Sequence, residues 1–308
     1  MPPLCYRSRM QQGIATTVLL PIALGIIMFG LGLSLTLADF KRVIVYPKAV
    51  AVGLLCQMLL LPAICFGLVK VLDLAPELAV GFMLLAASPG GATANLFSHL
   101  AKGDVALNIT LTAVNSIVSL FTLPLVVNFA LASFMAKDVA IPMQFSKVVS
   151  VFAVVLVPVT IGMLVHAKKK DLATRLGKPV KIASACFLVL VVLATVLKER
   201  SNLGSAFAQV GLAALLFNLA SMGIGYVVPL VVRLPRGQAI AIGMEIGIHN
   251  GTLAIAIAMS PMLLDNPKMA LPAAIYSLIM FVTAAIFSAV VSRRNLDDGS
   301  PEASATAS

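Results

Sequence analysis

The chain has 308 residues, of which 60% are hydrophobic and only 11% are charged, and its mean hydropathy is +1.04. Soluble domains carry about 25% charged residues, so this composition argues against a soluble enzyme, a nucleic-acid-binding module and a disordered regulator. The net charge of +10 rests on few charged residues and fits membrane topology better than nucleic-acid binding.

Nine apolar segments predict an all-α polytopic membrane protein. A bilayer core requires roughly 20 apolar residues per helix, and the connections between the segments are too short for a soluble domain. We expect residues 1–16 to form an extracytoplasmic segment and residues 292–308 a disordered cytoplasmic tail. The nine predicted transmembrane helices within residues 17–291 are Thr17–Leu37, Ala49–Val69, Leu78–Leu100, Val105–Leu131, Val148–His166, Val180–Leu197, Ala206–Val232, Gln238–Met259 and Leu271–Val291.

The Lys and Arg residues predict the orientation of these helices. Nine spans place the termini on opposite sides, and eight of the 22 basic residues fall on the N-terminal side against 14 on the other. This bias predicts that the N-terminus is outside and the C-terminus is in the cytoplasm. The basic segment 168–181 then becomes a cytoplasmic loop that marks topology, with binding of anionic lipid as the less favoured interpretation.

The sequence shows no motif for a disulfide framework, a zinc site or a catalytic centre. The four cysteines form no CxxC pair and no Cys/His cluster, so neither a disulfide framework nor a zinc site is expected. No nucleophile, base and orienting group occur together, so the chain is not expected to be an enzyme or to carry a cofactor.

Two of the nine segments hold polar and flexible residues at mid-span. The third contains SPGGATAN at 88–95, and the eighth contains GMEIGIHNGT at 243–252. Unwound backbone at membrane depth persists only where protein or a water-filled cavity satisfies it, and such breaks often hold ions. The alternative is a pair of kinked helices with small residues for close packing.

The order of the two interrupted segments predicts an inverted-topology repeat. They are the third and eighth spans, so they run in opposite directions, as inverted repeats in secondary transporters require. The first repeat would cover about 17–131 and the second about 148–291.

Glu245 is the one acidic residue of the chain expected at mid-span. No Lys or Arg is expected there, so a mobile cation or a proton must balance the carboxylate; a protonated, structural Glu is the alternative. Asn108, Thr112, Asn115 and Ser119 share one helical face of the fourth span. Oxygen donors suited to a hard cation such as sodium come from Gln57, Asn95, Asn108, Thr112, Glu245 and Asn250.

Several motifs together resemble the bacterial members of the bile acid:sodium symporter family, from about Pro21 to Arg293. They are LGIIMFGLGLSL at 24–35, PGGATAN at 89–95, LAKGDVALNITLTAV at 100–114 and EIGIHNGTLA at 245–254. The resemblance implies two discontinuous crossing helices and a core domain that moves against a panel domain, so that a central cavity opens alternately to each side. It also implies two sodium ions near the crossing.

Carried over by motif, the resemblance implies the residues of both ion sites and of the substrate site. The first sodium site would use Asn95, Asn108, Thr112 and Glu245. The second would use Gln57, Glu245, His249 and the backbone carbonyls of Ile246 and Ile248. Substrate would contact Asn250, with Thr93, Asn115 and Thr252 as further candidates.

The chain departs from the family pattern in its ion and substrate sites. Ala94 stands where the family usually has Ser, and His249 stands where it usually has Gln. Met280 and Phe281 replace a His-Asn pair, which indicates a changed substrate pocket. The chain also lacks the opening helix of the ten-helix members. Because only a neutral imidazole can ligate a cation, His249 makes proton coupling an alternative.

The predicted function is sodium-coupled import of an organic anion, either bile-acid-like or a small carboxylate. We expect a monomer in the bacterial inner membrane whose partners are sodium, the substrate and the lipid bilayer. One alternative is a proton-coupled organic anion carrier that uses Glu245 and His249. Alternatives of another class are a non-transporting membrane receptor and a channel.

Overall fold

The computed structural model is helical wherever it describes regular structure, and it describes residues 20–91, 93–135, 145–180, 182–183, 186, 203–260 and 263–297. Within these ranges β-structure is limited to one isolated bridge between Gly90 and His249. A further helix, besides the labelled ones, covers residues 170–180. The labelled elements are α2 (Leu20–Ser34), α3 (Leu37–Lys41), η2 (Arg42–Ile44), α4 (Pro47–Leu55), η3 (Cys56–Leu60), α5 (Leu61–Val71), α6 (Pro76–Ala87), α7 (Ala94–Leu100), α8 (Val105–Phe134), α9 (Phe145–Lys168), α11 (Leu203–Val231), α12 (Arg236–Gly247), α13 (Gly251–Met259), η4 (Pro267–Ala270) and α14 (Leu271–Asp297).

The lengths and the apolar surfaces of these helices are those of a membrane protein. Four of the described helical stretches are long and apolar enough to cross a bilayer: Pro47–Val71, Val105–Phe134, Val210–Val231 and Pro267–Ser292. The outer face of α8 carries the exposed apolar side chains of Phe121, Leu125 and Phe129. Exposing such an apolar face to water is energetically unfavourable, whereas contact with lipid tails is not. The predicted all-α membrane class is therefore confirmed.

Both interrupted segments are broken where the sequence predicts. The third span divides into α6 and α7, and the eighth divides into α12 and α13. The second span is continuous but includes a turn of π-helix, η3, immediately before Pro62. Proline has no N–H and its ring crowds the preceding turn, so a wider turn relieves the conflict.

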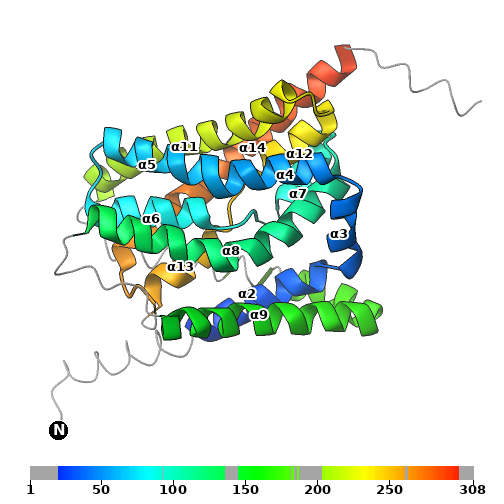
Figure 1. Ribbon diagram of the computed structural model, residues 1–308, viewed down its shortest axis with the longest axis horizontal. Helices are drawn as coiled ribbons and strands as arrows, with labels where there is room; N and C mark the ends of the chain where they lie inside the picture. Colours follow the sequence, from blue (N-terminus) through cyan, green and yellow to red (C-terminus); the bar gives the residue numbers. More distant parts are fainter. Residues whose placement is uncertain are drawn as a thin grey trace, which may run out of the picture.

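The helices form two layers (Figure 1). The pair α2 and α9 lies along one side of a larger bundle that contains α4 to α8 and α11 to α14. The backbones of α2 and α9 contact each other at two glycines. A methyl group on Gly32 would overlap the carbonyl of Val159, and one on Gly162 would overlap that of Phe29. Only glycine permits this approach at these two positions. The short helix α3 leads the chain from α2 into the bundle.

The connections that follow successive spans lie at alternate ends of the molecule. At one end, where α4, α8 and α12 begin (on the right in Figure 1), the connections contact one another. Lys48 Nζ donates to the carbonyl of Val232 at 2.7 Å, and Asp104 N–H donates to the carbonyl of Gly237 at 2.9 Å. At the other end, Lys268 and Glu77 form an ion pair at 3.6 Å. The first end carries several of the basic connections that the charge count assigns to the cytoplasm.

Some predicted segments fall outside the part of the chain that the structure describes. They are residues 1–16, most of the sixth span and the last part of the predicted tail, 298–308. Residues 292–297, which the sequence assigned to the tail, continue α14 to Asp297.

Candidate ion and substrate site

The two helix breaks pair with each other at the centre of the larger layer. Gly91 N–H donates to the carbonyl of Ile248 at 2.7 Å, and Asn250 N–H donates to the carbonyl of Pro89 at 2.9 Å. Each break thus satisfies backbone groups that the other has freed, as backbone outside a helix at membrane depth requires. The pairing brings the ends of four half-helices, α6, α7, α12 and α13, to one point.

Glu245 lies in the last turn of α12, directly beside this crossing, and is completely buried. Its Oε2 accepts a hydrogen bond from Thr112 Oγ1 at 2.6 Å, and its Oε1 accepts one from Asn115 Nδ2 at 3.0 Å. The backbone N–H of Gly90 is a third donor. A methyl group on Gly90 would overlap the carboxylate, so glycine is needed at this position to let the two breaks approach.

The partners of the Glu245 carboxylate are all neutral. The described part of the chain contains two ion pairs, Arg42 with Asp39 and Lys268 with Glu77, and neither involves Glu245. An ionised carboxylate at the bilayer centre costs about 3 kcal/mol or more unless it is compensated. The site is therefore built to receive a positive charge, either a proton or a cation.

Three buried amide oxygens on α7 and α8 have no hydrogen-bond partner in the described structure: the Oδ1 atoms of Asn95, Asn108 and Asn115. Two of these amides are held by their nitrogens, since Asn108 Nδ2 donates to the carbonyl of Ala241 at 2.7 Å and Asn115 Nδ2 donates to Glu245. Buried polar atoms are rarely left unpaired. Amide and carboxylate oxygens together suit a hard cation.

The donor set does not suit a transition metal. Among the described residues, no group of three or more His, Cys, Asp or Glu side chains is arranged to hold a metal ion. One carboxylate with neutral oxygens matches a monovalent alkali cation, because a single negative charge balances a single positive one.

A second group of polar side chains meets at the carbonyl of Ser88, in the first break. Gln57 Nε2 donates to this carbonyl at 2.9 Å, and His249 Nδ1 lies 3.3 Å from it. A carbonyl only accepts, so the contact places the proton of a neutral His249 on Nδ1 and leaves a lone pair on Nε2. Gln57 Oε1 and His249 Nε2 are both buried and without a partner in the described structure.

An aromatic and amide network holds His249 and the end of α12. The imidazole stacks on Phe217 with a centroid distance of 5.8 Å and meets Tyr276 edge-on at 5.3 Å. The carbonyl of Gly247 accepts from Tyr276 Oη and from Asn218 Nδ2, each at 2.9 Å. Sequence reasoning missed these residues; the available signal was an Asn and a Tyr inside apolar spans seven and nine.

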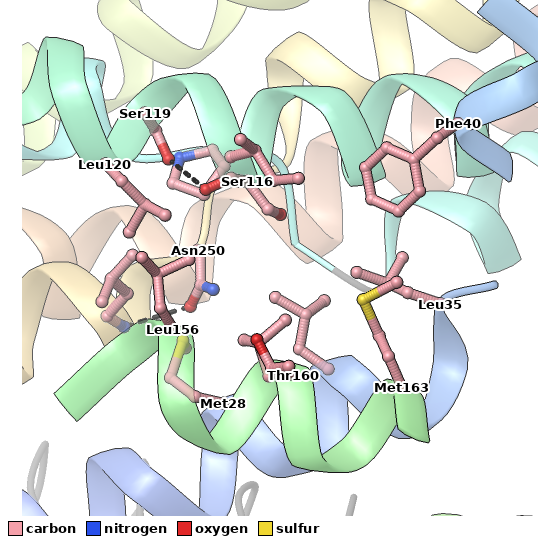
Figure 2. A pocket seen from close by; sticks show the side chains of 15 residues that line it. Met28, Leu35, Phe40, Ser116, Ser119, Leu120, Leu156, Thr160, Met163 and Asn250 are labelled. Carbon is pink, nitrogen blue, oxygen red and sulfur yellow. Dashed lines mark hydrogen bonds between the residues drawn. The ribbon is translucent and has the colours of Figure 1, made fainter. Parts of the chain in front are cut away.

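A small cavity of about 70 Å³ separates this crossing from α2 and α9 (Figure 2). Asn250 reaches it from the crossing, Ser116 and Ser119 from α8, and Thr160 from α9. The remaining described lining is apolar, and none of the described lining residues is charged. Asn250 Oδ1 also accepts from Leu253 N–H at 3.0 Å, so this side chain caps α13.

The structure brings many, but not all, of the predicted site residues together. Around Glu245 lie Thr112 and Asn115, with Asn108 one turn away on α8, while α7, which carries Asn95, packs against α8 and α12. Gln57 and His249 share the Ser88 carbonyl. Ile246 and Ile248 are buried between Glu245 and His249 in the chain, and the Ile248 carbonyl accepts from Gly91 N–H at the crossing. Thr93 is exposed, and Thr252 is half-buried outside the described cavity lining.

Asn115, one of the residues predicted to contact substrate, lies beside Glu245 in the structure. It contacts the Glu245 carboxylate and does not line the cavity. Its spacing of three residues from Thr112 puts both side chains on one helical face, so they reach the same partner.

Comparisons with known proteins place the chain among transporters. Residues 21–206 match the model of the family described as "Sodium Bile acid symporter family". The chain is 30% identical to an uncharacterized sodium-dependent transporter, YocS, of Bacillus subtilis, over 83% of this chain and 77% of that protein. It is 27% identical to a probable chloroplastic sodium/metabolite cotransporter, BASS2, of Oryza sativa, over 84% of this chain but only 60% of that protein. It is 25% identical to the human ileal sodium/bile acid cotransporter, over 89% of this chain and 78% of that protein.

Proposed function

The chain belongs to the sodium bile acid symporter family, and we propose that it imports an organic anion together with sodium by alternating access. The family is one of transporters, not of enzymes. The names of the relatives support sodium as the coupling ion: the Bacillus protein is called sodium-dependent, and the human protein is called a sodium/bile acid cotransporter.

The observation that carries this proposal is the Glu245 carboxylate, which is completely buried beside the crossing with neutral partners. A permanent ion pair with Lys or Arg would give Glu245 a structural role. A cation that binds and dissociates gives it a role in transport, because the charge of the site then changes during each transport cycle. Sodium is that partner in our proposal.

The first sodium ion would bind Glu245 and the unpaired oxygens of Asn95 and Asn108, together with Thr112. We add Asn115 to this set, because its amide already contacts the carboxylate and its own oxygen is unpaired. The ion would add oxygen contacts from α7 to the hydrogen bonds that already join α8 to α12. Its binding energy would therefore stabilise one arrangement of the crossing.

The second sodium ion would lie at the Ser88 carbonyl, between Gln57 and His249, with the carbonyls of Ile246 and Ile248 and with Glu245 as the charged ligand. The unpaired Oε1 of Gln57 and Nε2 of His249 support this position. Imidazole nitrogen is a softer ligand than an amide oxygen. This site should therefore bind sodium more weakly than the first.

The substrate would bind at the cavity beside Asn250, which would have to widen from its volume of about 70 Å³, because ordinary ligand pockets hold about 300 Å³ or more. Since the described lining offers no cationic side chain, the N-terminal end of α13 and the nearby sodium ions would supply the positive potential for an anion. Ions and anion then favour the same conformation, which is coupling in the thermodynamic sense. With two sodium ions for each monovalent anion, net positive charge would enter and the membrane potential would drive uptake.

The architecture we propose has nine transmembrane helices in an inverted repeat, about 17–131 and about 148–291. The layer containing the crossing would be the core domain, and the layer containing α2 and α9 would be part of the panel domain. The cavity between these layers supports relative motion at this boundary. We further propose a monomer in the bacterial inner membrane, with its N-terminus outside and with Thr93 and Thr252 reached by substrate only in another conformation.

Uptake by proteoliposomes tests the function. A first screen measures thermal stabilisation of the purified protein by taurocholate, pantoate and other carboxylates in sodium and in potassium. A compound that stabilises only with sodium is then used as the radiolabelled substrate. An inward sodium gradient should drive its accumulation in vesicles containing wild-type protein and not in vesicles containing Glu245→Gln. Equal accumulation by both proteins would refute the role of Glu245.

Proton coupling through Glu245 and His249 is the second candidate. The unpaired Nε2 of His249 favours it, because an imidazole nitrogen with a free lone pair can either take up a proton or ligate an ion. In the same vesicles, accumulation driven by a pH gradient without sodium would support a proton-coupled carrier. Binding without accumulation would indicate a receptor, and single-channel currents would indicate a channel.

A further inference from the structure

A second and larger cavity lies at the end of the molecule where α2 and α9 finish. Its volume is about 430 Å³, and it is bounded by the end of α2, the end of α9 and the helix at 170–180. It shares none of its described lining residues with the cavity beside Asn250. The two cavities use different residues of α2: Leu33 and Ser34 line the larger one, whereas Met28 and Leu31 line the other, together with Leu35 just after the helix.

The larger cavity combines apolar walls with basic chemistry. Leu33, Ala173 and Ile182 supply apolar surface, and the exposed ammonium of Lys178 supplies a positive charge. Thr174 lies one turn before Lys178, so their side chains share a face. None of the described lining residues is acidic.

His166 fixes the wall between the two long helices. Its Nδ1 lies 2.6 Å from the carbonyl of Leu33, which ties the end of α9 to the end of α2. The helix at 170–180 closes on α2 from the other side, where a methyl group on Gly30 would overlap Val180. The cavity is therefore bounded by a fixed frame of three helices, and it is not merely a gap beside a loop.

The surroundings of the cavity carry an excess of positive charge. Between residues 168 and 178 the chain has Lys168, Lys169, Lys170, Arg175 and Lys178 against a single acid, Asp171. The adjoining faces of α9 expose Val157, Ile161 and Leu164, as a surface in contact with lipid tails would. A cavity with an apolar wall and a cation thus lies where apolar surface gives way to basic residues.

We propose that this cavity binds an anionic phospholipid, with the phosphate headgroup at Lys178 and the start of an acyl chain against Leu33 and Ile182. Free inorganic phosphate would meet the ammonium but leave the apolar wall uncovered, whereas a lipid covers both. The bound lipid would hold α2, α9 and the helix at 170–180 together. It would therefore stabilise the smaller layer, independently of sodium and of transported substrate.

Thermal stability in a neutral detergent tests this assignment without any transport assay. Dioctanoyl phosphatidylglycerol is titrated into the purified full-length protein, with dioctanoyl phosphatidylcholine and inorganic phosphate as separate arms. We expect phosphatidylglycerol to raise the melting temperature with a saturable dependence, and phosphatidylcholine and phosphate to leave it unchanged. An equal rise with phosphatidylcholine, or with phosphate alone, would overturn the proposal.

Matched variants locate the binding. Lys178→Gln should raise the half-saturating lipid concentration about three- to tenfold, the effect of losing one basic contact with an anionic headgroup. Lys170→Gln removes the same charge from the same helix but outside the described cavity lining, and it should keep the wild-type value. Thr174→Phe keeps every charge and narrows the cavity, so it should also lose the response. Equal effects of Lys178→Gln and Lys170→Gln would show general surface attraction instead of this site.

Discussion

At the residue scale, the site depends on amide side chains that are each fixed at one end. Asn108 and Gln57 donate through their nitrogens to backbone carbonyls, which leaves their oxygens free for a ligand. Asn115 does the same with the carboxylate itself. Fixing the nitrogen removes rotamer freedom before a cation arrives, so less entropy is lost on binding.

Replacement of Asn115 by Ala should weaken sodium binding. The substitution removes a hydrogen bond to a charged group, which is typically worth about 1.5–3 kcal/mol, and one proposed ligand oxygen. We expect the apparent sodium affinity in uptake assays to fall about tenfold or more. Thr110→Ala is the control, because the buried Thr110 hydroxyl bonds only to the Ala106 carbonyl of its own helix. Unchanged sodium affinity in Asn115→Ala would remove this residue from the site.

The sequence allowed prediction of the site residues that carry a periodic or compositional signal. Asn108, Thr112 and Asn115 recur at helical spacing on one face, and Glu245 is an acid in an apolar run. Tyr276 and Asn218 are also polar side chains inside apolar spans, but nothing in the sequence shows that both meet the Gly247 carbonyl on a different helix. The sequence also could not show that Asn115 turns toward Glu245, since that depends on how α8 and α12 pack.

At the scale of elements, the two broken helices stabilise each other through backbone hydrogen bonds. Pro89 and the adjacent glycines predict the end of α6, but α12 ends at Gly247 without any proline. Its end is stabilised from outside, by the backbone pairing with the first break and by the two donors on the Gly247 carbonyl. The position of the second break could therefore be inferred only from polar residues, not from a helix-breaking residue. The π-helical turn at Gln57 was likewise not predicted.

Gly90→Ala should abolish sodium coupling although the change adds only a methyl group. That methyl group would overlap the Glu245 carboxylate, and the two breaks would have to separate. We expect loss of sodium-driven uptake and of sodium-dependent stabilisation. Gly67→Ala adds the same group on α5, where nothing beyond the neighbouring backbone of its own helix lies within 4 Å of the new carbon, and should behave as wild type. Normal uptake by Gly90→Ala would mean that the crossing is looser than described.

A double-mutant cycle at the Gly247 carbonyl tests how the end of α12 is stabilised. Tyr276→Phe and Asn218→Leu each remove one of its two donors and should each cost about 1 kcal/mol of stability. The double variant leaves the carbonyl without either donor, so its loss should exceed the sum of the single losses. Thermal unfolding of the four proteins measures this coupling, and simple additivity would contradict it.

At the scale of the whole molecule, the proposed function has the two layers move past each other while sodium remains on one of them. Glu245 and its amide partners lie within the larger layer, whereas the cavity beside Asn250 is shared between both layers. Ion binding and substrate binding should therefore be separable by mutation. The sequence predicted the segments and their alternating direction, but not which helices form the smaller layer, because apolar periodicity does not identify packing partners.

Thr160→Phe should separate the two activities. From α9, the larger ring would fill the cavity, whose described lining does not include Glu245, so substrate-dependent stabilisation and uptake should be lost while sodium-dependent stabilisation persists. Ile161→Phe places the same ring on the adjacent residue, which is exposed and does not line the cavity, and should transport normally. Loss of the sodium response in Thr160→Phe would show that the two sites are not independent.

The most direct test of the central claim is the melting temperature of purified wild type and Glu245→Gln as sodium replaces choline at constant ionic strength. A ligand that binds only the folded state at 100 times its Kd adds about 2.7 kcal/mol of stability. Sodium should therefore raise the melting temperature of the wild type in a saturable manner. Sodium should leave the melting temperature of the folded Glu245→Gln variant unchanged, because the neutral amide no longer needs a cation. An equal rise in both proteins would contradict the claim that Glu245 holds the coupling ion.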